Sequence, residues 1–199
     1  MKREDWDRRY AGTELVWTAQ ANRFLVAEIE QLPPGRALDL ACGEGRNAVW
    51  LAERGWQVTG VDFSGVALAK AERLAESRGV EAEWVEADLL DFHPHPAAFD
   101  LVVVLYLQVP GEDREQILPR AAAAVAPGGT FLMVGHDATN IERGYGGPQD
   151  PRVLYAAGDL TPHLDGLELE RGGPVIRTVE TEEGTRNAVD VLVRARRSA

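Results

Sequence analysis

The sequence predicts an α/β protein, with helices on both faces of a mainly parallel, seven-stranded sheet and an antiparallel hairpin at the C-terminal edge. Three observations predict this fold. Short apolar runs alternate with helix-like stretches between residues 37 and 136. Two of the runs, VVVL and FLMV, are continuously apolar, which is typical of strands buried on both faces. Beyond residue 136, apolar and polar residues alternate on either side of a turn at 182–184.

The elements of the parallel part follow in order. Residues 17–32 are predicted to form a helix that ends at Pro33 and Pro34. The predicted strands are 37–41, 57–62, 81–87, 99–106 and 129–136, and the predicted helices between them are 46–54, 66–77 and 112–125. Ser64 is the expected N-cap of the second of these helices, and Gly79 follows it. This alternation predicts a Rossmann-like three-layer αβα sandwich.

The last third of the chain has a different pattern. Residues 140–152 are rich in Gly and Pro and are predicted to be a mobile loop that closes over a substrate. Three alternating segments, 167–172, 175–180 and 187–196, are predicted strands. The turn between the last two makes them an antiparallel pair at the edge of the sheet.

Composition narrows the class of protein. The chain has 199 residues, a formal net charge of −11 and one cysteine, Cys42. Its N-terminus lacks the apolar core of a signal peptide, and its apolar runs are shorter than the ~20 residues that span a bilayer. His93 and His95 alternate with prolines, which indicates a surface turn and no metal site. We therefore expect a cytoplasmic protein whose partner is a small molecule and neither nucleic acid nor a membrane.

A glycine turn, CGEGRN, follows the first predicted strand and opens a helix. It lacks the Lys-Ser/Thr of a phosphate-binding P-loop, and Ala48 stands at the third glycine of a dinucleotide fingerprint. Asp62 ends the second strand and suits a ribose diol, as in nicotinamide-binding domains. Asp88, after the third strand, adds a carboxylate that can accept from an adenine amine. The pattern favours a nucleoside without a pyrophosphate, and a nicotinamide-dependent oxidoreductase remains the alternative.

These motifs resemble a known family. The strings DLACGEGRNAVWLAERG, VTGVDFS, EADLLDF, FDLVVVLY and PGGTFLMVGH look like those of class I S-adenosylmethionine-dependent methyltransferases. The GxGRNAxxLAxxG form is most similar to the small tellurite-resistance and thiopurine-methyltransferase-like members. The resemblance is strong over residues 17–136 and looser beyond them. It implies that S-adenosylmethionine is the cofactor and S-adenosylhomocysteine the product.

The resemblance also implies roles for residues at the strand ends. It places Asp39, Gly43 and Gly45 at the methionine end of the cofactor, and Asp62 on the ribose. The remaining expected cofactor contacts are Trp17, Asn47, Phe63, Asp88, Leu89 and Leu105. Tyr106 and His136 are the candidate catalytic residues, because they end the fourth and fifth strands on the acceptor side. Further acceptor-side and lid candidates are Arg23, Gln108 and Asp137.

The implied reaction is an in-line displacement at carbon, which depends mainly on holding donor and acceptor close together. A protein that binds the cofactor without turnover is the other alternative. We expect one domain over residues 1–199: a helical cap (1–35), a cofactor-binding core (36–136), and a part with the substrate loop and C-terminal strands (137–199).

Overall fold

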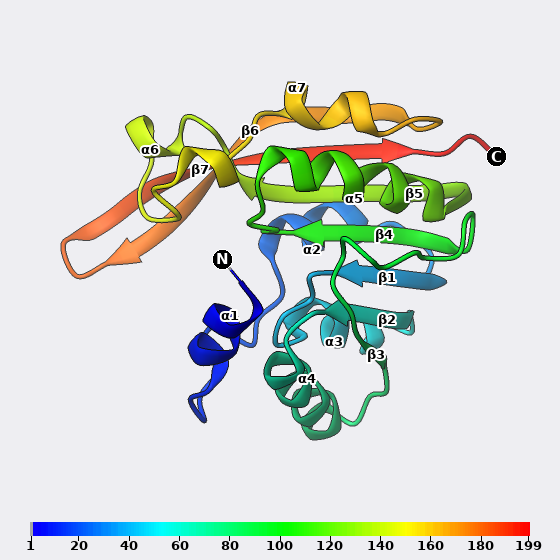
Figure 1. The fold of residues 1–199 in the computed structure, drawn as a ribbon, viewed down its shortest axis with the longest axis horizontal. Coiled ribbons are helices and arrows are strands. Elements are labelled where there is room, and N and C mark those ends of the chain that lie inside the picture. Colours follow the sequence, from blue (N-terminus) through cyan, green and yellow to red (C-terminus); the bar gives the residue numbers. More distant parts are fainter. Residues whose placement is uncertain (1) are drawn as a thin grey trace.

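The computed structural model describes residues 2–199, and they contain one sheet with the strand order β3-β2-β1-β4-β5-β7-β6 (Figure 1). The strands are β1 (Arg36–Leu40), β2 (Gln57–Asp62), β3 (Glu83–Glu86), β4 (Phe99–Leu105), β5 (Val125–His136), β6 (Glu168–Thr181) and β7 (Gly184–Arg196). Strands β1 to β5 pair in parallel, whereas β7 is antiparallel to both β5 and β6. The predicted fold class is confirmed.

Helices lie on both faces of this sheet (Figure 1). The elements are α1 (Arg3–Tyr10), α2 (Arg23–Ile29), α3 (Arg46–Ala52), α4 (Gly65–Arg78), α5 (Gly111–Ala124), α6 (Asn140–Arg143) and α7 (Ala157–Leu160), with short 3-10 turns at Pro151–Val153 and Thr161–His163. Buried side chains of α5 and α7 form one core with the sheet, and those of α2 and α3 form the other. Between residues 2 and 199, no helix is both long and apolar enough to cross a bilayer.

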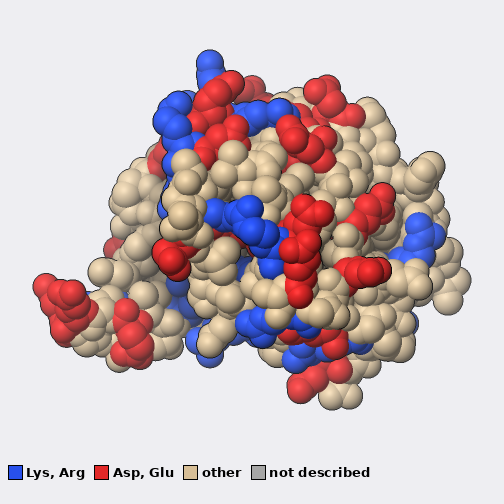
Figure 2. Space-filling view, turned by 90° about the horizontal axis from the view of Figure 1, so that it is seen from below, with Lys and Arg blue, Asp and Glu red and all other residues tan. Residues whose placement is uncertain are grey.

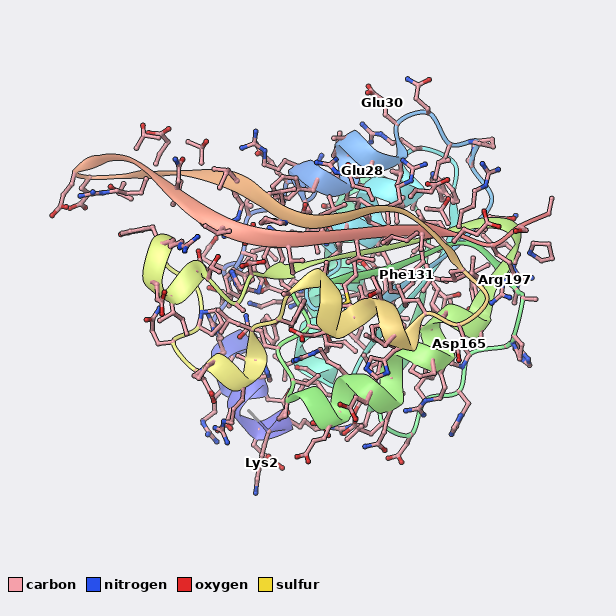
Figure 3. All side chains as sticks on the ribbon, turned by 90° about the horizontal axis from the view of Figure 1, so that it is seen from above. Lys2, Glu28, Glu30, Phe131, Asp165 and Arg197 are labelled. Carbon is pink, nitrogen blue, oxygen red and sulfur yellow. The ribbon has the colours of Figure 1, made fainter. Side chains whose placement is uncertain are left out.

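The central strand β4 explains the continuous apolar runs. Successive side chains of a strand point to opposite faces. Val102 and Val104 belong to the core under α5, whereas Leu101 and Val103 belong to the core under α2 and α3. Phe131 of β5 is fully buried on the α5 side (Figure 3). Both faces of the central strands are therefore covered, which explains their continuous apolar runs.

The N-terminal region differs from the prediction. The expected helix over residues 17–32 is shorter, because Asn22 caps α2: its side-chain oxygen accepts from the backbone N–H of Phe24 at 2.9 Å. Trp17 lies ahead of this cap in a segment without regular structure, and α1 precedes it. By contrast, Ser64 caps α4 as predicted and accepts from the backbone N–H of Ala67 at 3.1 Å.

The C-terminal region also differs in detail. The two strands expected at 167–172 and 175–180 are one strand, β6, with a register shift between Leu169 and Arg171. The helix expected over 112–125 ends at Ala124, and Val125 already belongs to β5. The hairpin of β6 and β7 extends past the rest of the sheet, and acidic side chains gather at its protruding end (Figures 1 and 2).

The base of this hairpin is attached to α2. Glu28 lies on α2 beside the hairpin (Figure 3), and its backbone carbonyl accepts from Nη1 of Arg194 at 2.7 Å. The Glu28 carboxylate also pairs with Arg171 of β6. The hairpin is thus fixed at its base, and its residues near 177 and 190 are held over the ends of β4 and β5.

Candidate active site

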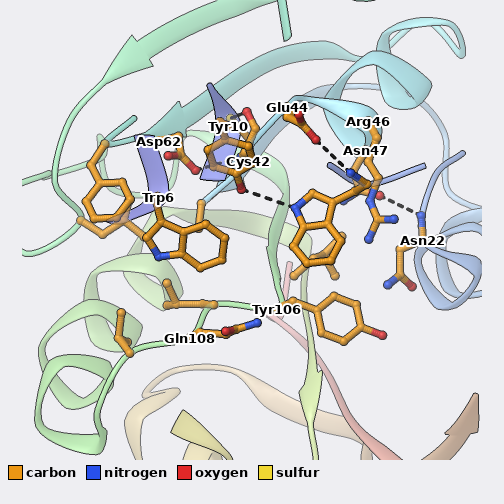
Figure 4. A pocket seen from close by; sticks show the side chains of 18 of the residues that line it. Trp6, Tyr10, Asn22, Cys42, Glu44, Arg46, Asn47, Asp62, Tyr106 and Gln108 are labelled. Carbon is orange, nitrogen blue, oxygen red and sulfur yellow. Dashed lines mark hydrogen bonds between the residues drawn. The ribbon is translucent and has the colours of Figure 1, made fainter. Parts of the chain in front are cut away.

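A cavity of about 860 Å³ lies at the carboxyl ends of the parallel strands, beside α1 (Figure 4). β1 is flanked by β2 on one side and β4 on the other, so the chain leaves these strands in opposite directions. Such a switch point opens a crevice in parallel sheets. Its wall includes residues at or just after the ends of five strands: Cys42 and Gly43, Asp62 and Phe63, Asp88 and Leu89, Leu105 and Tyr106, and His136.

The backbone is strained where β1 and β4 enter the cavity. Ala41 has a φ of 60° and Tyr106 a φ of 58°, the left-handed region that costs a residue with a side chain about 1 kcal/mol or more. Both residues line the cavity. The hydrogen bond from the backbone N–H of Tyr106 to the carbonyl of Val134, at 2.7 Å, holds this turn. The Tyr106 hydroxyl reaches Asp190 and Arg177 of the β6–β7 hairpin.

The two glycines of the CGEGRN turn have different surroundings. Gly43, with a φ of 54°, lines the cavity, and a Cβ there would lie 3.1 Å from the hydroxyl of Tyr10. Gly45 has a φ of 76°, and a Cβ there would lie 2.6 Å from Cβ of Ala71 and 2.9 Å from the ring of Trp84. Ala71 of α4 and Trp84 of β3 thus occupy the space that a side chain at Gly45 would need. Gly45 therefore allows α4 and β3 to pack closely against the glycine turn.

Asp62 faces the cavity and is only 6% exposed. Its carboxylate accepts from the backbone N–H of Gly43 at 2.8 Å and from that of Ser64 at 3.0 Å. Burial outweighs these hydrogen bonds and raises the pKa of Asp62. A carboxylate has about four acceptor positions, so two remain for further hydroxyl donors.

Asp39 lies deeper than Asp62, at 1% exposure. Neither of its carboxylate oxygens has a hydrogen-bond partner among residues 2–199. Burial, followed by the neighbouring charge of Asp62, raises the pKa of Asp39 to about 7. A buried carboxyl group without partners is costly when it is ionised, so Asp39 holds a proton over much of the acidic range.

Four polar side chains meet at the other end of the cavity, and we name them the Asp190 cluster: Tyr106, His136, Arg177 and Asp190. Asp190 is fully buried, and its carboxylate accepts from the Tyr106 hydroxyl at 2.7 Å and from Nε of Arg177 at 2.6 Å. Nδ1 of His136 lies 3.3 Å from its other oxygen. The rings of His136 and Tyr106 have centroids 4.9 Å apart.

The contacts within the Asp190 cluster determine which of its side chains are charged. Burial alone would raise the pKa of Asp190, but the contacts of its carboxylate with His136, Arg177 and Tyr106 lower it. Burial, together with the charge of Asp190, raises the pKa of Tyr106. At neutral pH the cluster therefore contains a carboxylate, a guanidinium and a neutral phenol. Arg177 and Asp190 were not predicted, although Asp190 interrupts an otherwise apolar run, AVDVLV.

The N-terminal segment forms another wall. Glu44 and Lys70 make an ion pair at 3.0 Å, with both side chains only 3% exposed. The Glu44 carboxylate also accepts from the backbone N–H groups of Val16 at 3.0 Å and Trp17 at 3.1 Å. Since residues 16 and 17 belong to the segment that follows α1, this buried carboxylate anchors that segment to the glycine turn.

Aromatic side chains of α1 and of the segment that follows it enclose the cavity. Trp6 stacks on Tyr10 with ring centroids 5.6 Å apart, and Nε1 of Trp17 donates to the Tyr10 hydroxyl at 3.5 Å. All three line the cavity (Figure 4). Trp6 and Tyr10 were not predicted, because the polar sequence of α1 shows no apolar face.

The structure brings most of the predicted site residues together. On the cavity wall are Trp17, Gly43, Asn47, Asp62, Phe63, Asp88, Leu89, Leu105, Tyr106 and His136, as well as Arg23 and Gln108. Among the described residues, Asp39, Gly45 and Asp137 do not reach the wall. The Asn47 side-chain oxygen accepts from the backbone N–H of Asn22 at 2.8 Å, so this residue also fixes the start of α2.

Comparison with known proteins identifies the fold and the domain. Residues 37–129 match a family model described as a methyltransferase domain. Demethylmenaquinone methyltransferase of Thermus thermophilus is 36% identical over 125 residues, covering 62% of this chain and 55% of that protein. Ribosomal RNA small subunit methyltransferase C of Alcanivorax borkumensis is 33% identical over 109 residues, covering 51% and 32%. The chain thus spans about half or less of the length of these relatives.

Two solved structures show the same fold over nearly the whole chain. The N-methyltransferase NodS of Bradyrhizobium japonicum, in complex with S-adenosylhomocysteine, aligns with a TM-score of 0.74 at 18% identity, covering 99% of this chain and 98% of that one. TehB of Haemophilus influenzae aligns with a TM-score of 0.73 at 19% identity, covering 99% and 68%. These matches confirm the predicted fold. Residues 37–129 thus resemble a methyltransferase domain, and the chain has the fold of the class I S-adenosylmethionine-dependent methyltransferases.

Proposed function

We propose that this protein transfers a methyl group from S-adenosylmethionine to a small-molecule acceptor. The observation that carries the proposal is that the cavity has two ends with different side chains. Asp62 and Asp88 lie after β2 and β3 at one end, and the Asp190 cluster lies at the other. A donor held at the first end and an acceptor held at the second would meet beside Tyr106.

The first end fits an adenosyl group. Asp62 keeps acceptor positions for a ribose diol after its two backbone hydrogen bonds. Phe63 and Leu89 offer apolar surface beside it, and Asp88 is exposed to the cavity as a further acceptor. Gly43 lets the cofactor approach the backbone closely. A Cβ at this position would take up that space and would already crowd the hydroxyl of Tyr10. These are the residues that would hold the cofactor.

S-adenosylmethionine, when bound, supplies a methyl group on a sulfonium for in-line displacement at carbon. The protein's own contribution is to align the acceptor and exclude water, which can lower a barrier by several kcal/mol (about 7 or more in well-oriented models). The indoles of Trp6 and Trp17 and the Tyr10 ring enclose the cavity for this purpose. Tyr106 and His136 would line the path of the acceptor.

His136 is the proposed base for an acceptor with an O–H or N–H nucleophile. Its Nδ1 lies 3.3 Å from the Asp190 carboxylate and has no hydrogen-bond partner among the described residues. A hydrogen on Nδ1 directed at that carboxylate leaves the lone pair on Nε2, which can take the proton that the acceptor loses. Asp190 then acts as a positioning residue that fixes the tautomer of His136.

The size and charge of the site support a small acceptor. The cavity of about 860 Å³ falls in the range of small-molecule sites. With a formal net charge of −11, the protein repels a phosphate backbone, although two relatives are named for methylation of ribosomal RNA. Figure 2 shows Lys and Arg side chains near the middle of one face with acids around them, and no continuous basic stripe crosses this face.

Calorimetric titration tests the proposal. S-adenosylmethionine and S-adenosylhomocysteine are expected to bind, and NADH is not. Binding of NADH alone would instead support the nicotinamide-dependent oxidoreductase. A screen with methyl-labelled S-adenosylmethionine against thiols, amines, phenols and carboxylic acids then identifies the acceptor. Binding without label transfer to any of these classes would support a non-catalytic module.

A further inference from the structure

The cavity contains an unpaired guanidinium. Arg46, the first residue of α3, points into the cavity on the side of Tyr106 and away from Asp62 (Figure 4). Its side chain makes no hydrogen bond or ion pair with any of residues 2–199. Burial lowers the pKa of Arg46, the nearby Asp39 raises it, and the positive charge of Arg177 lowers it further. Arg46 therefore makes no direct ion pair and lies within electrostatic range of both Asp39 and Arg177.

Arg177 keeps one edge of its guanidinium free. Its Nε donates to Asp190 at 2.6 Å and to the Tyr106 hydroxyl oxygen at 3.1 Å, and its Nη2 donates to Asp190 at 3.4 Å. Its Nη1 has no acceptor within the described part of the chain. The side chain is 26% exposed and lines the cavity together with its neighbour Thr178. Asp190 thus fixes the orientation of this guanidinium and leaves Nη1 available.

The acceptor end has an excess of positive charge. Arg177 pairs with Asp190, and the carboxyl group that acts on Arg46 is Asp39, which holds a proton over much of the acidic range. The carboxylates on the wall lie elsewhere: Glu44 is paired with Lys70, Asp62 and Asp88 lie at the ends of β2 and β3, and Glu4 and Asp113 belong to α1 and α5. The carboxylate of a bound cofactor could pair with only one guanidinium, and its sulfonium would add another positive charge. This excess lies inside a protein of net charge −11. Such a site attracts an anion more strongly than a neutral acceptor.

We propose that the methyl acceptor carries a carboxylate group, which the free edge of Arg177 binds. This inference rests on the proposed function and names its substrate class. A planar guanidinium matches a carboxylate in geometry, and the charge-assisted hydrogen bonds between them are among the stronger ones in proteins. Arg177 is then a specificity-determining residue that holds the acceptor with its nucleophile toward His136.

The test uses acids and their primary amides as paired probes. The full-length protein is loaded with S-adenosylhomocysteine and titrated with 4-hydroxybenzoate and 4-hydroxybenzamide, N-acetylglycine and N-acetylglycinamide, and hexanoate and hexanamide. In at least one pair the acid is expected to bind about tenfold or more tightly than its amide. Arg177→Gln should remove that preference and leave the affinity for the amide and for S-adenosylhomocysteine unchanged.

A matched control is available on the same strand. Arg171→Gln removes an exposed guanidinium of β6 that pairs with Glu28 outside the cavity, so the preference for the acid should persist. If S-adenosylhomocysteine binds but acids and amides bind alike, the carboxylate proposal is overturned and the proposed methyl transfer stands. An acid preference that survives Arg177→Gln also overturns it. If S-adenosylhomocysteine does not bind, both proposals fail together.

Discussion

Lys70 and Glu44 form a buried ion pair that joins α4 to the glycine turn and to the N-terminal segment. Nζ of Lys70 lies 3.0 Å from Oε1 of Glu44 and also donates to the backbone carbonyl of Glu14 at 2.6 Å. One buried contact therefore connects three parts of the chain that are distant in sequence. It holds the segment that carries Trp17 against the cavity.

Replacing Lys70 tests the energetic importance of this pair. In Lys70→Met, the Glu44 carboxylate stays buried without its counter-ion. The free energy of unfolding should fall by about 3–5 kcal/mol, measured by urea denaturation at neutral pH. Arg78→Gln is the control, because Arg78 pairs with Glu53 at 3.4 Å with its side chain 48% exposed. That variant should lose less than about 1 kcal/mol. Equal losses in the two variants would contradict the interpretation.

Gly45 and Gly79 allow a matched test of the glycine turn. Both have a positive φ, 76° and 67°, so alanine is strained at either position. Gly79 has open space around it, whereas a Cβ at Gly45 would lie 2.6 Å from Ala71. Gly79→Ala should lower the free energy of unfolding by about 1 kcal/mol, and Gly45→Ala by about 2–4 kcal/mol because overpacking is added. If thermal or urea unfolding shows a similar loss of stability in both variants, α4 can move to make room for a Cβ at Gly45.

Much of the site could be predicted from the sequence because of one geometric fact. Parallel strands end at the same edge of a sheet, so Asp62, Asp88 and His136, each placed just after or at the end of an apolar run, had to lie along one edge. The ends of α4 could also be predicted. Ser64 caps its start and Gly79 its end, and both roles depend only on the neighbouring backbone.

The rest of the site depends on long-range packing. Asp190 lies directly opposite His136 in the pairing of β5 with β7, and opposite Val175 in the pairing of β7 with β6. The register of two long strands brings Arg177 and Asp190 to Tyr106, and no local pattern specifies that register. α1 was missed for a related reason: its sequence, REDWDRRY, is polar, and only Tyr10 of the helix is buried.

The raised pKa of Asp39 predicts a pH-dependent stability. Its pKa is about 7 in the folded protein and about 4 in an unfolded chain, so between these values only the folded state holds the proton. The proton on Asp39 therefore stabilises the folded state at about pH 4 and below. As the pH rises from about 4 to about 7, the free energy of unfolding falls, by at most ~1.4 kcal/mol per pH unit. Asp39→Asn does not titrate. Urea unfolding across this range should show the variant gaining stability relative to the wild type as the pH rises, and parallel profiles would exclude the shift.

Asp62→Asn tests the ribose assignment. The substitution keeps one oxygen acceptor for the glycine turn but removes the charge that faces the cavity. The affinity for S-adenosylhomocysteine should fall by about 1.5–3 kcal/mol, the size of a charge-assisted hydrogen bond, as measured by calorimetry. Asp91→Asn removes an exposed acid outside the cavity wall and should leave the affinity unchanged. An unchanged affinity in Asp62→Asn would remove this residue from the proposed site.

Asp190→Asn tests the positioning of His136. The variant keeps the shape of the side chain but loses the charge that directs Nδ1 of His136 and orients Arg177. With the acceptor identified by labelled transfer, kcat should fall about a hundredfold or more, because general-base catalysis contributes about that much. The affinity for S-adenosylhomocysteine should be retained, since Asp62 and Gly43 lie at the other end of the cavity. Tyr106→Phe removes one hydrogen bond to Asp190 and should reduce kcat less. If kcat in Asp190→Asn matches the wild type, the acceptor needs no base and His136 serves only to line the cavity.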